Sequence, residues 1–419
     1  MANAAREFVL TRLAPSMSRL RINFWTRIIA QGSSGLCAVL CLAPVWFSNV
    51  NAQASLPKNC EGAEQQLKAA GEAEAHADWL TALARYQEAT RITPDCAEAL
   101  VNLGVIYNRL NRSEQAIAAF KQAIAQKPQL GPAHLNLGIT YFRTTRYELA
   151  AESLQKVLAI DPQNLQARQL LALSLIGREQ FEEASLELEK TLKLNPEDAA
   201  TLLALGEAYL RLKQYQKAIL HLEHMARLQP AVARTHLLLG EALDNAGESE
   251  RAVEAFRRAT SLDPTLPDAH YALGQALLKH GNLDEAALEF EQELKLNPTM
   301  VLARYQLGKT YFQRGKLDEA IAALTKVIEV EANFRPALET LGQAWLKKGS
   351  SEQAIIMLER AVNLDPTWPD AQALLGRAYL LAGRRDDAQR AFATSRRLAE
   401  DERKRLEIKV TKPKAESKP

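Results

Sequence analysis

Two histidines offer the first side chains to consider for chemistry. His221 and His224 are three residues apart, so a helix would place both on one face, where they could share a metal ion. Zinc normally takes four ligands, and no cysteine or acidic cluster in the sequence completes such a set. We therefore interpret the pair as solvated and predict no metal site.

Catalytic motifs are also absent from the sequence. It contains no Gly-rich phosphate loop, no nucleophile elbow and no zinc-ligand spacing. We predict that the chain is not an enzyme, has no catalytic residues and needs no cofactor.

The composition is that of a folded, soluble protein. Of 419 residues, 47% are hydrophobic and 24% charged, and the 6% of aromatics leaves alanine and leucine dominant, which favours helices. Five arginines and one acid fall in residues 1–52, so the remainder has a formal net charge of −2, against +2 for the whole. Nucleic-acid binding needs a basic face, so we predict no nucleic-acid partner.

Residues 1–52 have the order of a secretory signal peptide. Arginines precede a largely apolar stretch, residues 28–47, and small residues follow at Ala52 and Ala54. The alternative is an uncleaved membrane anchor, since the stretch is just long enough to span a bilayer. Met17 is an alternative start. We predict cleavage near Gln53 or Ser55 and an exported chain, periplasmic or secreted, with an anchored chain facing outside as the alternative.

Three residue types recur with a period of 34. Glycines mark one column, with Ala172 filling its single gap: Gly104, Gly138, Gly206, Gly240, Gly274, Gly308, Gly342, Gly376. Alanine never fails in a second column: Ala82, Ala116, Ala150, Ala184, Ala218, Ala252, Ala286, Ala320, Ala354, Ala388. Proline closes most repeats: Pro94, Pro128, Pro162, Pro196, Pro230, Pro264, Pro298, Pro366. His134, His236 and His270 also share one column, which indicates packing residues with solvated tips.

Each repeat is predicted to be a pair of helices. In residues 97–128, Leu100, Gly104 and Tyr107 share one face of a first helix. Ser113 is predicted to cap the second helix, and proline ends it because proline cannot continue a helix interior. Gly104 and Ala116 have almost no side chain, so the two helices can approach closely.

This pattern resembles that of tetratricopeptide-repeat proteins over about four-fifths of the chain. The resemblance implies an all-α, right-handed superhelical solenoid whose first helices line a concave groove that binds peptides or partner proteins. We assign residues 53–62 to a linker, 63–402 to ten repeats, and 403–419 to a charged extension and disordered tail. Ala332 replaces the closing proline of the eighth repeat, which predicts a continuous or bent connection there.

Side chains on the groove face are predicted to form the ligand site in repeats seven to nine. In the eighth repeat, Tyr305, Lys309 and Phe312 are spaced by four and three residues, so they should point together into the groove. The neighbouring repeats add Tyr271, Gln275, Gln343 and Lys347. Aromatic anchors beside amide and ammonium donors suit an extended peptide. The alternative is that the aromatic side chains only complete helix packing.

Cys60 and Cys96 are predicted to form a disulfide. They are the only cysteines outside the presequence, and an exported chain meets oxidising conditions. Each precedes the first helix of its repeat, and neighbouring first helices start side by side.

Two function classes follow. The first is an exported scaffold that binds other proteins or peptides and touches a membrane only through an uncleaved N-terminal segment, if at all. The second is a non-catalytic regulatory or anchoring subunit of an enzyme complex.

Overall fold

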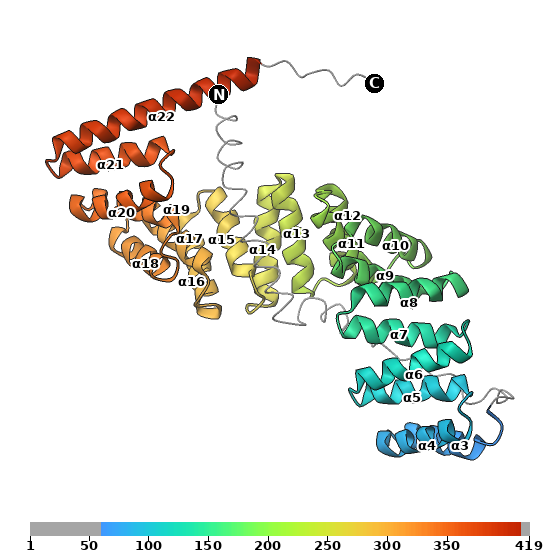
Figure 1. Cartoon of the computed structure of the whole chain (residues 1–419). Coiled ribbons are helices and arrows are strands. Elements are labelled where there is room, and N and C mark those ends of the chain that lie inside the picture. Colours follow the sequence, from blue (N-terminus) through green and yellow to red (C-terminus); the bar gives the residue numbers. More distant parts are fainter. Residues whose placement is uncertain (1–59, 412–419) are drawn as a thin grey trace. The chain divides into compact units, whose positions relative to one another are not determined.

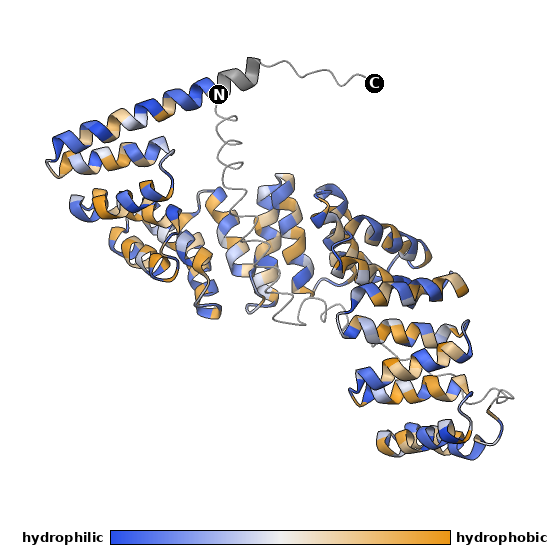
Figure 2. Cartoon of the chain, viewed as in Figure 1, coloured by the Kyte–Doolittle hydropathy of each residue, from blue (hydrophilic) through white to orange (hydrophobic). Residues whose placement is uncertain are grey.

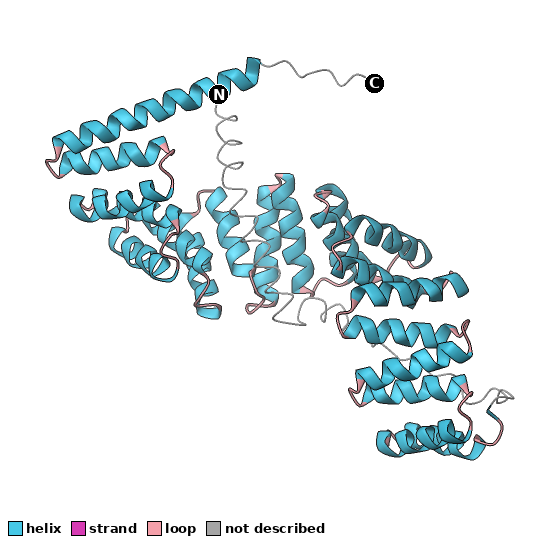
Figure 3. Ribbon diagram, in the orientation of Figure 1, coloured by secondary structure: helices cyan, strands magenta, loops and turns pink. Residues whose placement is uncertain are grey.

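The structure is a computed structural model that describes residues 60–411, and side chains from residue 60 to residue 404 (Figure 1). The predicted signal peptide, most of the linker and the end of the tail lie outside the described residues. The described part is helical and contains no strand (Figure 3). It divides into two compact units, and the boundary along the sequence lies between Leu228 and Gln229. We call them the N-terminal and C-terminal units and describe each by itself.

The N-terminal unit contains five helical hairpins. Their first helices are α3 (Glu64–Ala75), α5 (Ala97–Arg109), α7 (Gly131–Arg143), α9 (Leu165–Gly177) and α11 (Ala199–Arg211). Their second helices are α4 (Trp79–Ile92), α6 (Ser113–Gln126), α8 (Tyr147–Ile160), α10 (Phe181–Leu194) and α12 (Tyr215–Leu228). Each second helix up to α10 packs on the first helix of its own hairpin and on that of the next.

The C-terminal unit repeats this plan five times. Its first helices are α13 (Ala233–Ala246), α15 (Ala269–Lys279), α17 (Val301–Gln313), α19 (Arg335–Lys347) and α21 (Pro369–Leu381). Its second helices are α14 (Ser249–Leu262), α16 (Leu283–Leu296), α18 (Leu317–Val330), α20 (Ser351–Leu364) and α22 (Arg385–Thr411). Hydrophobic and hydrophilic residues alternate around the helices, as stacked hairpins require (Figure 2). The predicted all-α fold of stacked helical hairpins is confirmed.

The glycine column makes room for a phenylalanine or leucine side chain of the second helix. Gly104 lies against the ring of Phe120, and Gly240 lies in the same way against Phe256. A Cβ on either glycine would fall within 2.6 Å of that ring. Close packing of the two helices therefore depends on the missing side chain.

Tyrosines of the first helices tie successive hairpins together. Tyr311 Oη donates a hydrogen bond of 2.5 Å to Glu291 on the preceding second helix, and Tyr379 repeats the contact with Glu359 at 2.6 Å. Burial and the adjacent carboxylate raise the pKa of both tyrosines to about 12. In the N-terminal unit, Tyr107 accepts a hydrogen bond of 3.0 Å from Gln87 in the equivalent place.

The turn inside each hairpin needs one residue in the left-handed region. In the N-terminal unit this position is never glycine: Ala77, Asn111, Thr145, Glu179, Lys213, with φ between 57° and 59°. In the C-terminal unit it is always glycine: Gly247, Gly281, Gly315, Gly349, Gly383. Glycine takes this conformation without steric cost, so the first five turns carry strain that the last five lack.

Two local predictions were wrong. Ser113 makes no capping hydrogen bond, because α6 begins at Ser113 itself and Arg112 occupies the cap position. Of the two alternatives at Ala332, the continuous helix is wrong: α18 ends at Val330 and α19 begins at Arg335. A backbone hydrogen bond from Phe334 to Glu331 closes that turn, so proline is not needed to end the helix.

The recurring histidines have a structural partner. The Nε2 atoms of His134, His236 and His270 lie 2.9–3.1 Å from the carbonyl oxygens of the closing prolines Pro128, Pro230 and Pro264. Each imidazole N–H thus ties the start of a first helix to the end of the preceding repeat.

Candidate functional site

The predicted site residues lie on α15, α17 and α19, three successive first helices of the C-terminal unit. We call them the C-terminal face: Tyr271, Gln275, Tyr305, Lys309, Phe312, Gln343 and Lys347. Six of the seven are half-buried and Lys347 is exposed. The face can therefore be reached by solvent or by a ligand.

Phe312 and Lys347 form the most specific contact of this face. The Lys347 ammonium lies 4.2 Å from the centre of the Phe312 ring, within the range of a cation–π interaction. The two residues come from adjacent first helices, so the contact joins two repeats. It presents an aromatic surface and a positive charge side by side.

Tyr305 takes a larger part in helix packing than its neighbours on α17. Its ring centre lies 5.2 Å from that of Phe334, which precedes α19, at an angle of 60°. Burial raises the pKa of the Tyr305 hydroxyl. Tyr305 therefore contributes to the packing beneath the C-terminal face. Lys309, one helical turn later, is half-buried and accessible at the surface of that face.

Tyr271 and Gln275 act together on α15. Gln275 Nε2 donates a hydrogen bond of 2.5 Å to Tyr271 Oη. The Tyr271 ring centre lies 5.9 Å from that of Phe290 on α16. The Gln275 amide and the Tyr271 hydroxyl therefore hold each other in place on the C-terminal face, one repeat before Lys309.

An acidic residue beside this face was missed by the sequence reasoning. Glu293 on α16 is 2% exposed, and its carboxylate accepts a hydrogen bond of 3.3 Å from the Tyr271 N–H. Burial and the negative charge of Asp268 raise the pKa of Glu293. The signal was available in the repeat: other repeats carry small or apolar residues at this position, such as Ala259 and Val327.

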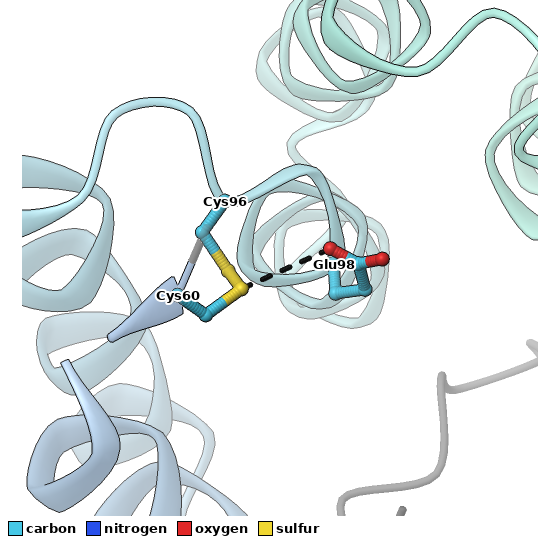
Figure 4. Close-up of side chains that lie close together, drawn as sticks. All are labelled: Cys60, Cys96 and Glu98. Carbon is cyan, nitrogen blue, oxygen red and sulfur yellow. Dashed lines mark hydrogen bonds between the residues drawn. A yellow bond between two sulfur atoms is a disulfide. The ribbon is translucent and has the colours of Figure 1, made fainter. Parts of the chain in front are cut away.

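Cys60 and Cys96 are brought together at the start of the N-terminal unit. Their Cα atoms are 4.9 Å apart and their sulfur atoms are at bonding distance (Figure 4). Glu98 Oε2 lies 3.8 Å from the sulfur of Cys60. Within the described residues these three side chains are also the one group close enough to hold a metal ion, but sulfurs joined to each other are not thiolate ligands.

The histidine pair considered first has another environment. The His221 ring stacks on Tyr209, with centres 5.7 Å apart, and burial lowers the pKa of His221. His221 therefore belongs to the packing between α11 and α12.

The comparisons with known families agree with the repeated hairpins. A model of the C-terminal domain of cilia and flagella-associated protein 70 matches residues 48–270, and one of subunit 3 of the anaphase-promoting complex matches residues 245–327. Two tetratricopeptide-repeat models match residues 305–371 and 345–406. The first model covers more than half of the chain, which belongs to the tetratricopeptide-repeat family. Proteins of this family mediate protein–protein interactions.

Several solved structures are similar to this chain. MamA from Desulfovibrio magneticus RS-1 is 25% identical, covering 41% of this chain and 96% of that one with a TM-score of 0.39. YrrB, described as a protein with an unusual peptide-binding site, is 20% identical, covering 45% and 96% with a TM-score of 0.42. The Cut9–Hcn1 structure is 14% identical, covering 84% and 97% with a TM-score of 0.41. No curated protein matches the sequence.

The described helices were also searched for membrane spans. None of those in residues 60–411 combines the length and the apolar character that crossing a bilayer requires.

Proposed function

We propose that this chain is an exported, non-catalytic scaffold that binds an extended peptide or a partner segment along its C-terminal face. The observation that carries the proposal is the Phe312–Lys347 pair, an aromatic ring and an ammonium 4.2 Å apart at a solvent-accessible surface. Export is supported by the basic, apolar and small-residue order of residues 1–52.

The chemistry of the face indicates the kind of segment that it takes. Phe312 offers apolar contact area, and Lys309 and Lys347 offer two positive charges within adjacent repeats. Gln275 and Gln343 supply amides that can pair with a peptide backbone. We infer that the bound segment combines an apolar side chain with a carboxylate.

Capture of partners tests the binding site. The Lys309→Ala, Phe312→Ala double variant should keep its melting temperature within a few degrees, because neither side chain is fully buried. It should lose most partner capture in a pull-down from an envelope fraction. A matched control is Lys326→Ala with Ile356→Ala, which removes an exposed lysine and a 53% exposed apolar residue from second helices. If the Lys309→Ala, Phe312→Ala variant captured as much partner as the control variant, the binding site would lie elsewhere.

The composition of the captured material separates the two function classes. A scaffold should bring down several assembly or structural proteins, whereas an anchoring subunit should bring down one enzyme in a fixed ratio.

N-terminal sequencing of the protein from its native host tests export. A first residue near Gln53 or Ser55 is expected. A cytoplasmic chain that retains Arg19 to Phe47 would refute this part of the proposal.

A further inference from the structure

Two exposed leucines end α21, the last first helix of the described residues (Figure 1). Leu380 is 52% exposed and Leu381 is 61% exposed. Neither belongs to the hydrophobic cluster that Leu375 and Ala378 of the same helix form with α20. Arg377 is also exposed and precedes the leucines by three and four residues, so the three side chains share one face of the helix. We call Arg377, Leu380 and Leu381 the α21 patch.

The preceding repeats show that hairpin packing does not require an apolar residue at position 381. The other four repeats of the C-terminal unit carry polar residues there: Asn245, Lys279, Gln313, Lys347. Arg377 has the same repeat position as Lys309 and Gln343, which belong to the C-terminal face. The α21 patch therefore continues the positions of that face and adds apolar surface to them.

The α21 patch has the same chemistry as the contact between Phe312 and Lys347. Leu346 and Leu380 follow Phe312 at intervals of 34 residues, so one column of the repeat is apolar from α17 to α21. Helices α17, α19 and α21 contact one another in succession. Apolar surface and a positive charge are thus found side by side a second time, two first helices after Phe312.

The charge of Arg377 is available to a ligand. Within the part of the chain that the structure describes, Arg377 makes no ion pair, whereas Lys279 of the same unit is paired with Asp244. The one acid of α21 is Asp370, seven residues earlier, which is about 10 Å along the helix. A carboxylate from outside the chain can therefore pair with Arg377.

We propose that the α21 patch is a second subsite for the segment that Phe312 and Lys347 bind, and that it takes a second apolar side chain together with the carboxylate of an acidic side chain. This inference rests on the proposed function. Leu380 and Leu381 supply the apolar surface, and the guanidinium of Arg377 can bind a carboxylate through two parallel hydrogen bonds.

The spacing of the helices sets the spacing in the ligand. Packed helices lie about 8–10 Å apart, so the two steps from α17 to α21 cover about 16–20 Å. An extended chain advances about 3.3 Å per residue. The two pairs of apolar and acidic residues in the bound segment are therefore about five or six residues apart.

Two synthetic peptides test this inference on the mature chain. The two-pair peptide has two Leu-Asp pairs whose leucines are six positions apart, with serine and glycine between them. The one-pair peptide has Ser-Asn in place of the second pair. Both are acetylated and amidated, so side chains carry their only carboxylates. In fluorescence anisotropy the two-pair peptide should bind at least tenfold more tightly, because its second pair binds at high effective concentration.

Arg377→Gln with Leu381→Gln removes the second subsite. Gln343 and Gln313 occupy the same two positions in earlier repeats, so this variant should fold and keep its melting temperature. The two-pair peptide should bind it no more tightly than the one-pair peptide, whose affinity should not change.

A matched control is Arg396→Gln with Val330→Gln. It removes an exposed arginine from α22 and a 68% exposed valine from α18. This control should keep the tenfold difference between the peptides. Loss of the difference in the control as well would overturn the assignment to the α21 patch.

The outcomes separate this inference from the proposed function. Equal binding of the two peptides to the unaltered chain would overturn the second subsite and leave the Phe312–Lys347 site standing. Binding of neither peptide would overturn both. A photoreactive residue in place of the second leucine of the two-pair peptide gives an independent readout: it should cross-link to residues 369–381, and cross-links confined to second helices would overturn the proposal.

Discussion

Gly104 lies so close to Phe120 that a Cβ at residue 104 would stand 2.4 Å from Cε1 of the ring. The large ring and the missing side chain are two halves of one contact between α5 and α6. In both units the other glycines of this column lie as closely against a phenylalanine or leucine of the second helix, so the column sets the spacing between first and second helices.

Gly104→Ala should therefore destabilise the N-terminal unit by about 1–3 kcal/mol, as overpacking of a core does. Thermal unfolding followed by circular dichroism measures the change. Gly71→Ala is the matched control, since Gly71 lies within α3 and a Cβ there would meet nothing within 4 Å. That control should gain about 0.5–1 kcal/mol from helix propensity. A stabilising effect of both substitutions would contradict the packing role of Gly104.

The strained turns of the N-terminal unit make a second prediction. Thr145 has a φ of 58°, and a β-branched residue is poorly suited to the left-handed region. Thr145→Gly should raise stability by about 0.5–1 kcal/mol, the relief of strain less the greater freedom of glycine in the unfolded chain. Gly349→Thr, at the equivalent turn with φ of 84°, should lower it by a similar amount. Equal effects of the same sign would exclude strain as the cause.

Glu293 should make the stability of the C-terminal unit depend on pH. Its pKa in the folded state is raised above the ordinary value of 4.5 by burial and by Asp268, while His270 and the Tyr271 N–H act in the opposite direction. The folded state therefore binds the proton more tightly than the unfolded state, so this group favours folding as the pH falls from 7 towards 4.5.

Glu293→Val introduces the residue type found at Val327 in the next repeat. At pH 7 it should stabilise the C-terminal unit by about 1–3 kcal/mol, because a buried ionised group is removed. The gain should shrink as the pH is lowered through the raised pKa. Glu329→Val, which removes an exposed acid from α18, serves as the control. The measurement is the melting temperature of each variant from pH 7 to pH 4.5. A stability gain of Glu293→Val that did not change with pH would show that ionisation of Glu293 is not its cause.

Much of the fold could be predicted from the sequence because each repeat contains the residues that determine how its two helices pack and where they end. In one hairpin, Gly104 and Ala116 mark where the two helices approach closely, and Pro128 follows the end of the second helix. The same residue types recur every 34 residues, so the same prediction applies to each repeat. Local details were harder. A helix boundary shifts by one residue without changing the core, which is why Ser113 begins α6 instead of capping it.

The candidate site was less predictable than the fold. Helical spacing places Tyr305 and Phe312 on one face, but it does not say which ring is taken up by the next repeat. The residues of the next repeat determine which ring is buried. Phe334 packs against Tyr305, whereas Lys347 lies over Phe312 and leaves that pair accessible. The left-handed turn at Thr145 gave no signal, because threonine is not the residue that such a turn usually selects.

The last prediction concerns Cys60 and Cys96, which are both fully buried. The cysteines are 36 residues apart, and a bridge that closes such a loop adds about 3–4 kcal/mol in the chain-entropy model. Because α3 and α4 form the first hairpin of the described residues and stack there on one neighbouring hairpin only, this stabilisation falls on the hairpin that most needs it. Cys60→Ser with Cys96→Ser should therefore speed hydrogen exchange in α3 and α4, with little change in α15 to α22.

Counting free thiols tests the bridge directly. Mature protein, unfolded without reductant, should show no reactive thiol, because the other two cysteines lie in the predicted presequence. The titration should include a chelator, since Cys60, Cys96 and Glu98 could hold a metal ion if the sulfurs were reduced, and a bound metal would hide thiolates. Two reactive thiols per chain would refute the disulfide. A return to two thiols after reduction, together with faster exchange in α3 and α4, would show that the bridge itself holds the first hairpin in place.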